Sequence, residues 1–437
     1  MKKLLLVLLV SPILAAWLTI PVLAQKQSNF GKPEALQILK NAKNEIKKHY
    51  YDEKFHGIDL DEQFNKAEEK VKNAQNTGQL MGIIAQTLLE FNDSHLYFSP
   101  PSRMNKFEYG FKFGAVGEDT MITAVKPGSD AEKQGLKTGD RVSNISGYPA
   151  IREKLWVLRY LFYALRPQAG LRLTIKAPDD VERTIDVQAK IRQGKQVTDL
   201  TNMNEIFNLI RDSEGDEHLY RQRYAKISED IFVWKMPGFD VEESIVDGMI
   251  GRAKKCKSLI LDLRGNGGGY VTTLQRLVSS VFDREVKIAD RKGRKELKPV
   301  IAKKRGDGFT GKVIVLIDSS SASASEAFAR VIQLEKRGTV IGDRSAGAVM
   351  EALGYSFEIG LGTVIPYGLT ITDADVIMTD GKSLENVGVT PDEMKLPTPK
   401  DLAAGRDPVL AYAIELAGAK ISPEDAGKMF PLEWPVK

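Results

Sequence analysis

Two segments of the chain share one pattern, in which an apolar run breaks into a loop of small residues and then enters a helical stretch. Residues 259–263 break into Arg-Gly-Asn-Gly-Gly-Gly at 264–269, and residues 313–317 break into Asp-Ser-Ser-Ser-Ala-Ser-Ala-Ser-Glu at 318–326. Reactive groups gather at the carboxyl ends of strands in parallel α/β sheets. Glycine N–H groups can converge on an anion, and a serine at such a junction can act as a nucleophile. The pair predicts an oxyanion hole facing a serine.

The first 24 residues have the pattern of a secretory signal. Lys2 and Lys3 precede an apolar stretch, and Val-Leu-Ala at 22–24 forms a small-residue cleavage site. No later run is long and apolar enough to span a bilayer. We therefore expect an exported protein, periplasmic or secreted, with no integral membrane span after signal removal. An uncleaved N-terminal anchor is the alternative.

Composition excludes several classes of protein. The formal net charge of +4 is spread along the chain, so we expect no nucleic-acid partner. The single cysteine, Cys256, excludes an intramolecular disulfide framework and a cysteine metal cluster, and we interpret it as a structural thiol. No motif indicates a metal or a cofactor, and we expect neither.

Pattern changes divide the chain into six segments. They are a signal peptide at 1–24, an N-terminal helical region at 25–103, a β-rich unit at 104–194, a polar linker at 195–228, a core at 229–398 and a tail at 399–437 with one helix near 407–418. In the core, strands are expected at 232–234, 258–263, 313–317 and 339–342, with helices at 241–255, 270–281 and 325–335. This alternation predicts an α/β fold with a parallel sheet.

The β-rich unit resembles a PDZ domain. Its opening aromatic-glycine segment is followed by a Pro-Gly-Ser turn at 127–129, a Gly-Asp-Arg-Val segment at 139–142, a helix at 152–165 and a strand at 171–175. The resemblance implies that the opening segment presents backbone N–H groups to a peptide carboxylate, with the peptide added as a strand. That segment is Tyr109, Gly110, Phe111, Lys112 and Phe113. The alternative is a small β-rich insert with structural Gly-Asp turns.

Taken together, four motifs resemble those of the serine peptidases related to the C-terminal processing peptidases and the tricorn core. They are Leu-Asp-Leu-Arg-Gly-Asn-Gly-Gly-Gly at 261–269, Ser-Ala-Ser-Ala-Ser-Glu at 321–326, Ile-Gly-Asp at 341–343 and Glu-Asn-Val-Gly-Val-Thr-Pro-Asp at 385–392. The similarity extends over roughly 35–395. It implies a crotonase-like α/β catalytic core with an N-terminal helical segment and an inserted PDZ domain.

By the family's pattern the nucleophile is the serine three positions before the glutamate, which is Ser323. We interpret the neighbouring Ser321 and Ser325 as loop and helix N-cap residues. The processing peptidases pair their serine with a lysine, but the matching position here is Ala348, which cannot take a proton. Arg344 is nearby, and a guanidinium is a poor general base.

The tricorn branch uses a Ser-His-Ser-Glu tetrad, and this chain has Ser94, His95 and Glu385 at the matching places. Imidazole is the usual base for a serine hydroxyl, and it needs a partner on its other ring nitrogen. The resemblance thus implies that His95 is the general base and that Ser94, backed by Glu385, holds it. We expect Asp93 to be an N-cap or turn residue, and Asp262 to form a structural hydrogen bond or an ion pair, with Arg264 as a candidate partner. His49, His56 and His218 are interpreted as surface or packing residues.

The same resemblance places the oxyanion hole on Gly267 or Gly268 together with Ala324. A phosphate-binding loop is excluded because no Gly-Lys-Ser/Thr follows Gly269.

These residues lead to an exported serine peptidase that forms an acyl-enzyme on Ser323 and recognises peptide or protein C-termini through the PDZ unit. The alternative is an inactive peptide-binding scaffold with the same architecture. A crotonase-type acyl-CoA enzyme is a third reading, and an exported location lacks CoA. Crotonase-like domains often assemble, so a homo-oligomer is left open.

Overall fold

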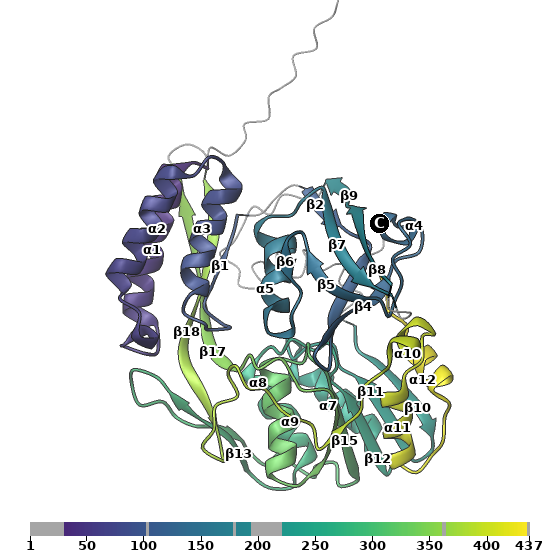
Figure 1. The fold of residues 1–437 in the computed structure, drawn as a ribbon. Coiled ribbons are helices and arrows are strands. Elements are labelled where there is room, and N and C mark those ends of the chain that lie inside the picture. The colour runs from purple at the N-terminus through teal and green to yellow at the C-terminus, as the bar shows by residue number, and fades with distance from the viewer. Residues whose placement is uncertain (1–29, 102–104, 178–180, 194–220, 361–363, 435–437) are drawn as a thin grey trace, which may run out of the picture.

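The computed structural model describes residues 30–101, 105–177, 181–193, 221–360 and 364–434. The expected signal peptide and most of the expected linker lie outside these residues. Three parts are visible in Figure 1: an α/β layer at the bottom, a β-rich unit above it, and a helical layer along a long β-hairpin.

The α/β layer is built on a six-stranded sheet. Its order is β10 (Arg223–Ser228), β11 (Ile231–Lys235), β12 (Ser258–Asp262), β15 (Lys312–Ile317), β16 (Gly338–Gly342) and β19 (Glu393–Met394). All neighbours are parallel except β10 and β11, which are antiparallel. The core strands therefore lie close to where the apolar runs predict them. In contrast, β10 falls inside the segment expected to be a linker, because its alternating polar residues resemble a loop in sequence.

Helices cover both faces of this sheet, which explains the unbroken apolar runs of β12 and β15. One face packs against α7 (Glu243–Ala253), α8 (Val271–Val281) and α9 (Ala324–Leu334). The other face packs against α11 (Pro408–Leu416), whose Leu410 and Ile414 contact the side chains that point the opposite way. The tail also contains α10 (Pro399–Ala403) and α12 (Pro423–Met429), where only one helix was predicted.

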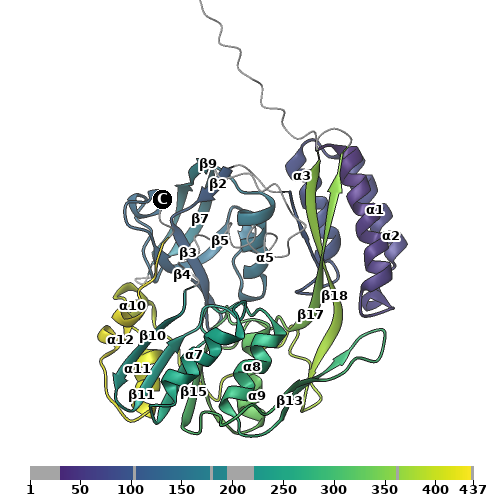
Figure 2. The same ribbon diagram turned by 180° about the vertical axis from the view of Figure 1, so that it is seen from behind.

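A long antiparallel hairpin, β17 (Met350–Ile359) with β18 (Ile365–Met378), rises from the α/β layer and was not predicted. Its sheet also contains β1 (Tyr97–Ser99), β13 (Val286–Lys292) and β14 (Val300–Ala302). Helices α1 (Lys32–His49), α2 (Leu60–Asn73) and α3 (Thr77–Leu89) pack beside it, as both ribbon views show (Figures 1 and 2), and a short 3₁₀ turn, Phe55–Gly57, joins α1 to α2. Because β1 pairs with β18, residues near 95 are carried to the α/β layer.

The β-rich unit contains a sheet in the order β3 (Phe111–Val116), β4 (Asp119–Val125), β5 (Arg141–Ile145), β7 (Gly170–Lys176) and β8 (Glu182–Gln188), with β6 (Tyr148–Pro149) paired to β5. A separate pair joins β2 (Asn105–Glu108) to β9 (Lys190–Gln193), and α4 (Asp130–Lys133) follows the turn after β4. The helix expected at 152–165 is helical throughout, but consists of a 3₁₀ turn (Arg152–Lys154), α5 (Leu155–Arg159) and a π-helix (Tyr160–Leu165).

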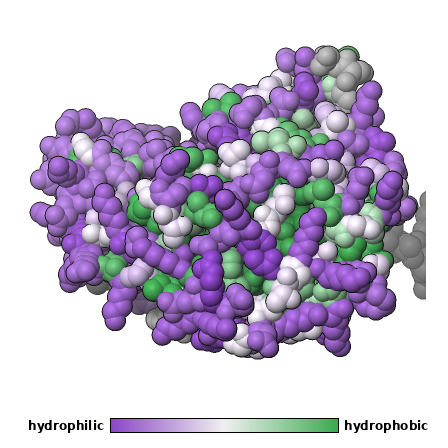
Figure 3. Space-filling view, turned by 90° about the horizontal axis from the view of Figure 1, so that it is seen from below, coloured by the Kyte–Doolittle hydropathy of each residue, from purple (hydrophilic) through white to green (hydrophobic). Residues whose placement is uncertain are grey.

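Among the residues described, no helix is long and apolar enough to cross a membrane. The face seen from below is mostly hydrophilic, with apolar residues showing between the polar ones (Figure 3).

Candidate active site

Three of the predicted residues meet in one hydrogen-bonded relay. Ser94 and His95 lie between α3 and β1, and Glu385 follows β18. The Ser94 hydroxyl lies 2.7 Å from His95 Nδ1 and donates to Glu385 Oε2 at 2.9 Å. The Ser94 backbone N–H donates to the other carboxylate oxygen at 2.8 Å. Pairing of β1 with β18 brings these groups together although Ser94 and Glu385 are 291 positions apart.

The proton on the serine hydroxyl determines the histidine tautomer. When Ser94 Oγ–H donates to Glu385, the serine oxygen can only accept from His95, so Nδ1 carries the ring proton. Nε2 then has a free lone pair, which is the form that a general base requires.

Burial shifts both titratable groups of the relay. It raises the pKa of Glu385 to about 7, with a smaller contribution from the negative charge of Asp93. Burial lowers the pKa of His95, while Asp93 acts in the opposite direction. Within the described part of the chain, no lysine or arginine forms an ion pair with Glu385. The carboxylate is therefore held by N–H and O–H donors alone.

Asp93 anchors the backbone of His95 beside this relay. It is buried and accepts the backbone N–H of His95 at 2.8 Å. It also accepts the hydroxyls of Tyr50 at 2.9 Å and Thr372 at 2.8 Å. These bonds fix the His95 backbone against α1 and β18.

Ser323 lies at the junction of β15 and α9 with an unusual backbone, φ 55° and ψ −118°. A non-glycine residue with positive φ is strained, and such strain concentrates at functional sites. Its N–H donates to Ala348 O at 2.8 Å and to Glu326 Oε2 at 3.0 Å. Ser323, and not Ser325 as predicted, is the N-cap of α9. Ser325 lies within the helix, where its hydroxyl donates to Asn266 O and Ala322 O, each at 2.9 Å.

Glu326 organises this region and was not predicted to do so. Its carboxylate is fully buried and accepts from Ser345 Oγ at 2.5 Å, Gly347 N at 2.8 Å and Ala348 N at 2.9 Å, besides Ser323 N. Burial raises its pKa, and the four donors oppose that shift. The fixed spacing of Glu326 from Ser323 was visible in the sequence, but its partners 19 to 22 positions away were not.

The glycine loop lies against the serine. A Cβ on Gly268 would lie 2.6 Å from Ser323 Cβ, and Gly268 has φ +94°, so only glycine fits. Of the two glycines predicted as oxyanion donors, Gly268 already donates its N–H to Asn266 Oδ1 at 2.9 Å, which makes Gly267 the better suited of the two. In the described residues no acceptor is bonded to Gly267 N or Ala324 N, and these two N–H groups are available to a ligand.

The serine and the relay are joined through the 348–349 backbone. Ser323 N–H bonds to Ala348 O, and the next N–H, that of Val349, donates to Glu385 Oε2 at 2.8 Å. No hydrogen bond between Ser323 Oγ and His95 is present among the described residues. Catalytic hydrogen bonds are often long without a ligand and tighten once substrate is bound.

The segment expected to bind a peptide carboxylate lies partly inside the protein. Tyr109 is buried, and its phenol donates to Gln168 O at 3.0 Å. Phe111, Lys112 and Phe113 belong to β3, an edge strand, with Gly110 preceding it at φ +73°. Two carbonyls of this edge are already bonded across to other elements. Arg159 donates to Phe113 O and Ser319 Oγ donates to Ala115 O, each at 2.7 Å.

The other described histidines have local partners, and the cysteine is buried. His49 lies 3.2 Å from Glu45 and stacks on Tyr355. His56 contacts Tyr51 Oη at 2.6 Å, whereas His218 lies outside the described residues. Cys256 is buried and unpaired, and burial raises its pKa, so it is poorly suited to act as a nucleophile.

Part of the chain is similar to known peptidases. Residues 233–394 match peptidase family S41. A carboxy-terminal-processing protease of Bartonella bacilliformis is 29% identical over 296 residues, covering 64% of this chain and 61% of that protein. The chloroplastic C-terminal processing peptidase of Tetradesmus obliquus is 24% identical over 362 residues, covering 78% of this chain and 73% of that protein.

Solved structures show the same fold. The crystal structure of mature CPAF aligns with a TM-score of 0.62 at 15% identity, over 85% of this chain and 94% of that one. The chain spans about three fifths of the length of the Bartonella relative, 61%. Residues 233–394 of this chain form the part that belongs to peptidase family S41.

Proposed function

We propose that this chain is a serine peptidase that hydrolyses peptide bonds through an acyl-enzyme on Ser323, with His95 as general base. The observation that carries the proposal is the Ser94–His95–Glu385 relay, assembled across 291 positions at distances of 2.7 and 2.9 Å. The position at which the processing peptidases have a lysine is Ala348, so the chain needs another base, and His95 is the histidine with a matching partner.

In the first half-reaction, His95 Nε2 takes the proton from Ser323 Oγ as the oxygen attacks the carbonyl carbon. The negative oxygen that forms accepts from Gly267 N and Ala324 N, and such donors typically contribute about 3 kcal/mol each. His95 then gives the proton to the amide nitrogen, the C–N bond breaks, and the amine leaves. In the second half-reaction His95 deprotonates water, which cleaves the ester and restores Ser323.

The relay makes this chemistry depend on the charge of Glu385. When the carboxylate is ionised, it accepts the hydrogen bond from the Ser94 hydroxyl. The Ser94 oxygen then accepts from His95, so the ring proton stays on Nδ1. A protonated carboxyl can instead donate to Ser94, whose proton then turns to Nδ1 and leaves Nε2 protonated. Since burial raises the pKa of Glu385 to about 7, we expect the rate to rise with pH near neutrality.

The finer assignments belong to the same proposal. We assign residues 229–398 to a crotonase-like core and residues 104–194 to a PDZ domain that recognises substrate C-termini. A peptide that pairs with β3 near Phe113 would have to displace the bond from Arg159. Residues 1–24 would direct the chain out of the cytoplasm as a signal peptide.

The test is cleavage of peptides with free C-termini by the mature protein and by Ser323→Ala and His95→Ala. Both variants should lose roughly 10⁴- to 10⁶-fold in kcat. Ser143→Ala, at an exposed serine, and His49→Ala, at a half-buried histidine, are controls outside the relay and should keep wild-type rates. Cleavage by Ser323→Ala at the wild-type rate would contradict the proposal. A wild-type protein that binds such peptides without cleaving them would favour an inactive peptide-binding scaffold.

A further inference from the structure

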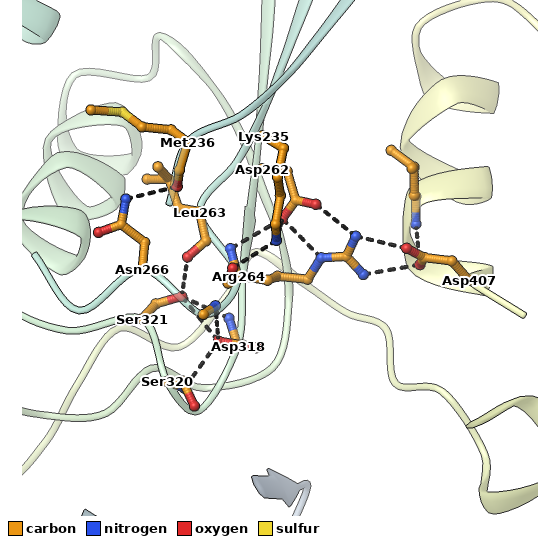
Figure 4. A network of polar contacts seen from close by, with 12 residues as sticks. Lys235, Met236, Asp262, Leu263, Arg264, Asn266, Asp318, Ser320, Ser321 and Asp407 are labelled. Atoms are coloured by element: carbon orange, nitrogen blue, oxygen red, sulfur yellow. Dashed lines mark hydrogen bonds and ion pairs between the residues drawn. The ribbon is translucent and has the colours of Figure 1, made fainter. Parts of the chain in front are cut away.

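A second polar cluster lies on the loop that carries Gly267. At its centre is Arg264, between two carboxylates from distant parts of the chain (Figure 4). Its guanidinium donates to Asp262 at 2.8 and 2.9 Å, and to both oxygens of Asp407 at 2.7 and 2.9 Å. Lys235 from β11 completes the set, 3.1 Å from Asp262. The pair of Asp262 with Arg264, predicted from the sequence, is therefore confirmed, and Asp407 is an additional partner.

The ion network contains two carboxylates and two basic side chains, and burial lowers the pKa of Lys235 while Asp262 opposes that shift. Asp262 is 1% exposed, and burial would raise its pKa, but Arg264 and Lys235 hold that pKa well below its ordinary value. Burial likewise opposes the ionised form of Asp407, and Arg264 lowers its pKa overall. Both carboxylates are therefore ionised at neutral pH, and the bidentate geometry fixes the plane of the guanidinium.

The network holds the backbone that leads to the candidate oxyanion donor. Asp262 accepts the Arg264 N–H at 3.0 Å, and Lys235 Nζ donates to Arg264 O at 2.7 Å. One residue further, Gly265 N–H donates to Asp318 Oδ1 at 2.8 Å. The side-chain amide of Asn266 then donates to Met236 O at 2.9 Å. Gly267 therefore follows three residues that are each held by a hydrogen bond.

Asp407 is itself held rigidly. It is the N-cap of α11, where its carboxylate accepts Leu410 N–H at 2.9 Å, and its own N–H donates to Pro423 O at 2.8 Å. The α11 side chains Leu410 and Ile414 are fully buried against the sheet. A carboxylate fixed on a docked helix is a suitable support for a flexible arginine, because little side-chain freedom remains to be lost.

We propose that Asp407 is a positioning residue for the Gly267 oxyanion donor and acts through Arg264. The N-terminus of α11 would then support the catalytic unit. This inference rests on the proposed function. An error of about 1 Å in such a donor costs on the order of 100-fold in rate, so a small movement of the loop would be measurable.

The test compares Asp407→Ser with Ser422→Ala. Serine at 407 keeps a good N-cap for α11 but cannot pair with the guanidinium. Ser422 is the N-cap of α12 and has no bond to the glycine loop, so its alanine variant controls for the loss of a cap in the same segment. Asp407→Asn, which retains one acceptor for Arg264, should give an intermediate result.

We expect Asp407→Ser to lower kcat by about 10- to 100-fold with KM changed less than about twofold, while Ser422→Ala keeps the wild-type kcat. The pH dependence of kcat/KM should keep its midpoint, because the relay is untouched. A wild-type kcat in Asp407→Ser would overturn the inference.

Amide hydrogen exchange separates this inference from the proposed function. Residues 264–268 should exchange faster in Asp407→Ser than in the wild type or in Ser422→Ala, whether or not the protein cleaves peptides. Unchanged exchange there would overturn the support by Asp407, whereas a wild type with the expected exchange but no cleavage would contradict the proposed function alone.

Discussion

The ion network and the Ser94–His95–Glu385 relay each contain a buried carboxylate, but the two carboxylates have opposite kinds of partner. In the ion network, Asp262 faces Arg264 and Lys235, and its pKa is held well below the ordinary value. In the relay, Glu385 accepts N–H and O–H groups and has no cationic partner in the described part of the chain, and burial raises its pKa to about 7.

This difference separates a structural carboxylate from a titrating one. A carboxylate paired with cations stays ionised across the physiological range and fixes a backbone, whereas a buried carboxylate without a cation can gain or lose a proton near neutral pH. Glu326 is a third case, in which burial raises the pKa but four donors hold the carboxylate in place. Burial alone therefore does not identify a functional carboxylate, and neither does the absence of a cationic partner, which Glu326 shares with Glu385 in the described part of the chain.

The largest effect on stability is expected from breaking the ion network around Asp262. Asp262→Asn leaves Arg264 and Lys235 beside each other with one carboxylate fewer, and breaking a buried pair in this way typically costs about 3–5 kcal/mol. Urea unfolding of the variant should show this loss in the free energy of unfolding. Asp186→Asn, which breaks the exposed pair with Arg172, is the control and should remain near the wild type. Equal, small losses in both variants would mean that the cluster does not stabilise the fold.

A smaller effect on stability is expected from the relay, and it depends on pH. Glu385 binds its proton more tightly in the folded chain, so its contribution is complete below the ordinary pKa of 4.5 and is lost as the pH rises through about 7. The free energy of unfolding of the wild type, minus that of Glu385→Gln, should fall by about 1–3 kcal/mol between those two pH values. A constant or rising difference would contradict a raised pKa for Glu385.

The sequence predicts the local parts of this protein better than the distant ones. The strands β12 and β15 and helices α7, α8 and α9 lie near their predicted positions, because uninterrupted apolar runs and loop glycines mark them. The β17–β18 hairpin was missed, since its mixed burial pattern over 10 and 14 residues gives neither a simple alternation nor a short apolar run.

The same limit applies to the site. The family resemblance nominated Ser323, His95, Ser94 and Glu385, and in the structure His95 and Glu385 both contact the Ser94 hydroxyl. The sequence could not show that Gly268 N–H is already bonded to Asn266, because that bond depends on loop conformation. Nor could it show that Asp407 meets Arg264, since 143 positions separate them and no local pattern relates them. Side-chain partners brought together by tertiary packing leave no periodic signal in the sequence.

The most direct test of the central claim is the rate at which a fluorophosphonate labels Ser323, followed by mass spectrometry from about pH 5 to about pH 9 in the wild type and in Glu385→Gln. We predict that labelling of the wild type rises with pH through about 7, and that the variant labels much more slowly and loses this rise. Labelling of Ser323 that is equally fast in both proteins, or independent of pH, would contradict a base controlled by the Glu385 carboxylate.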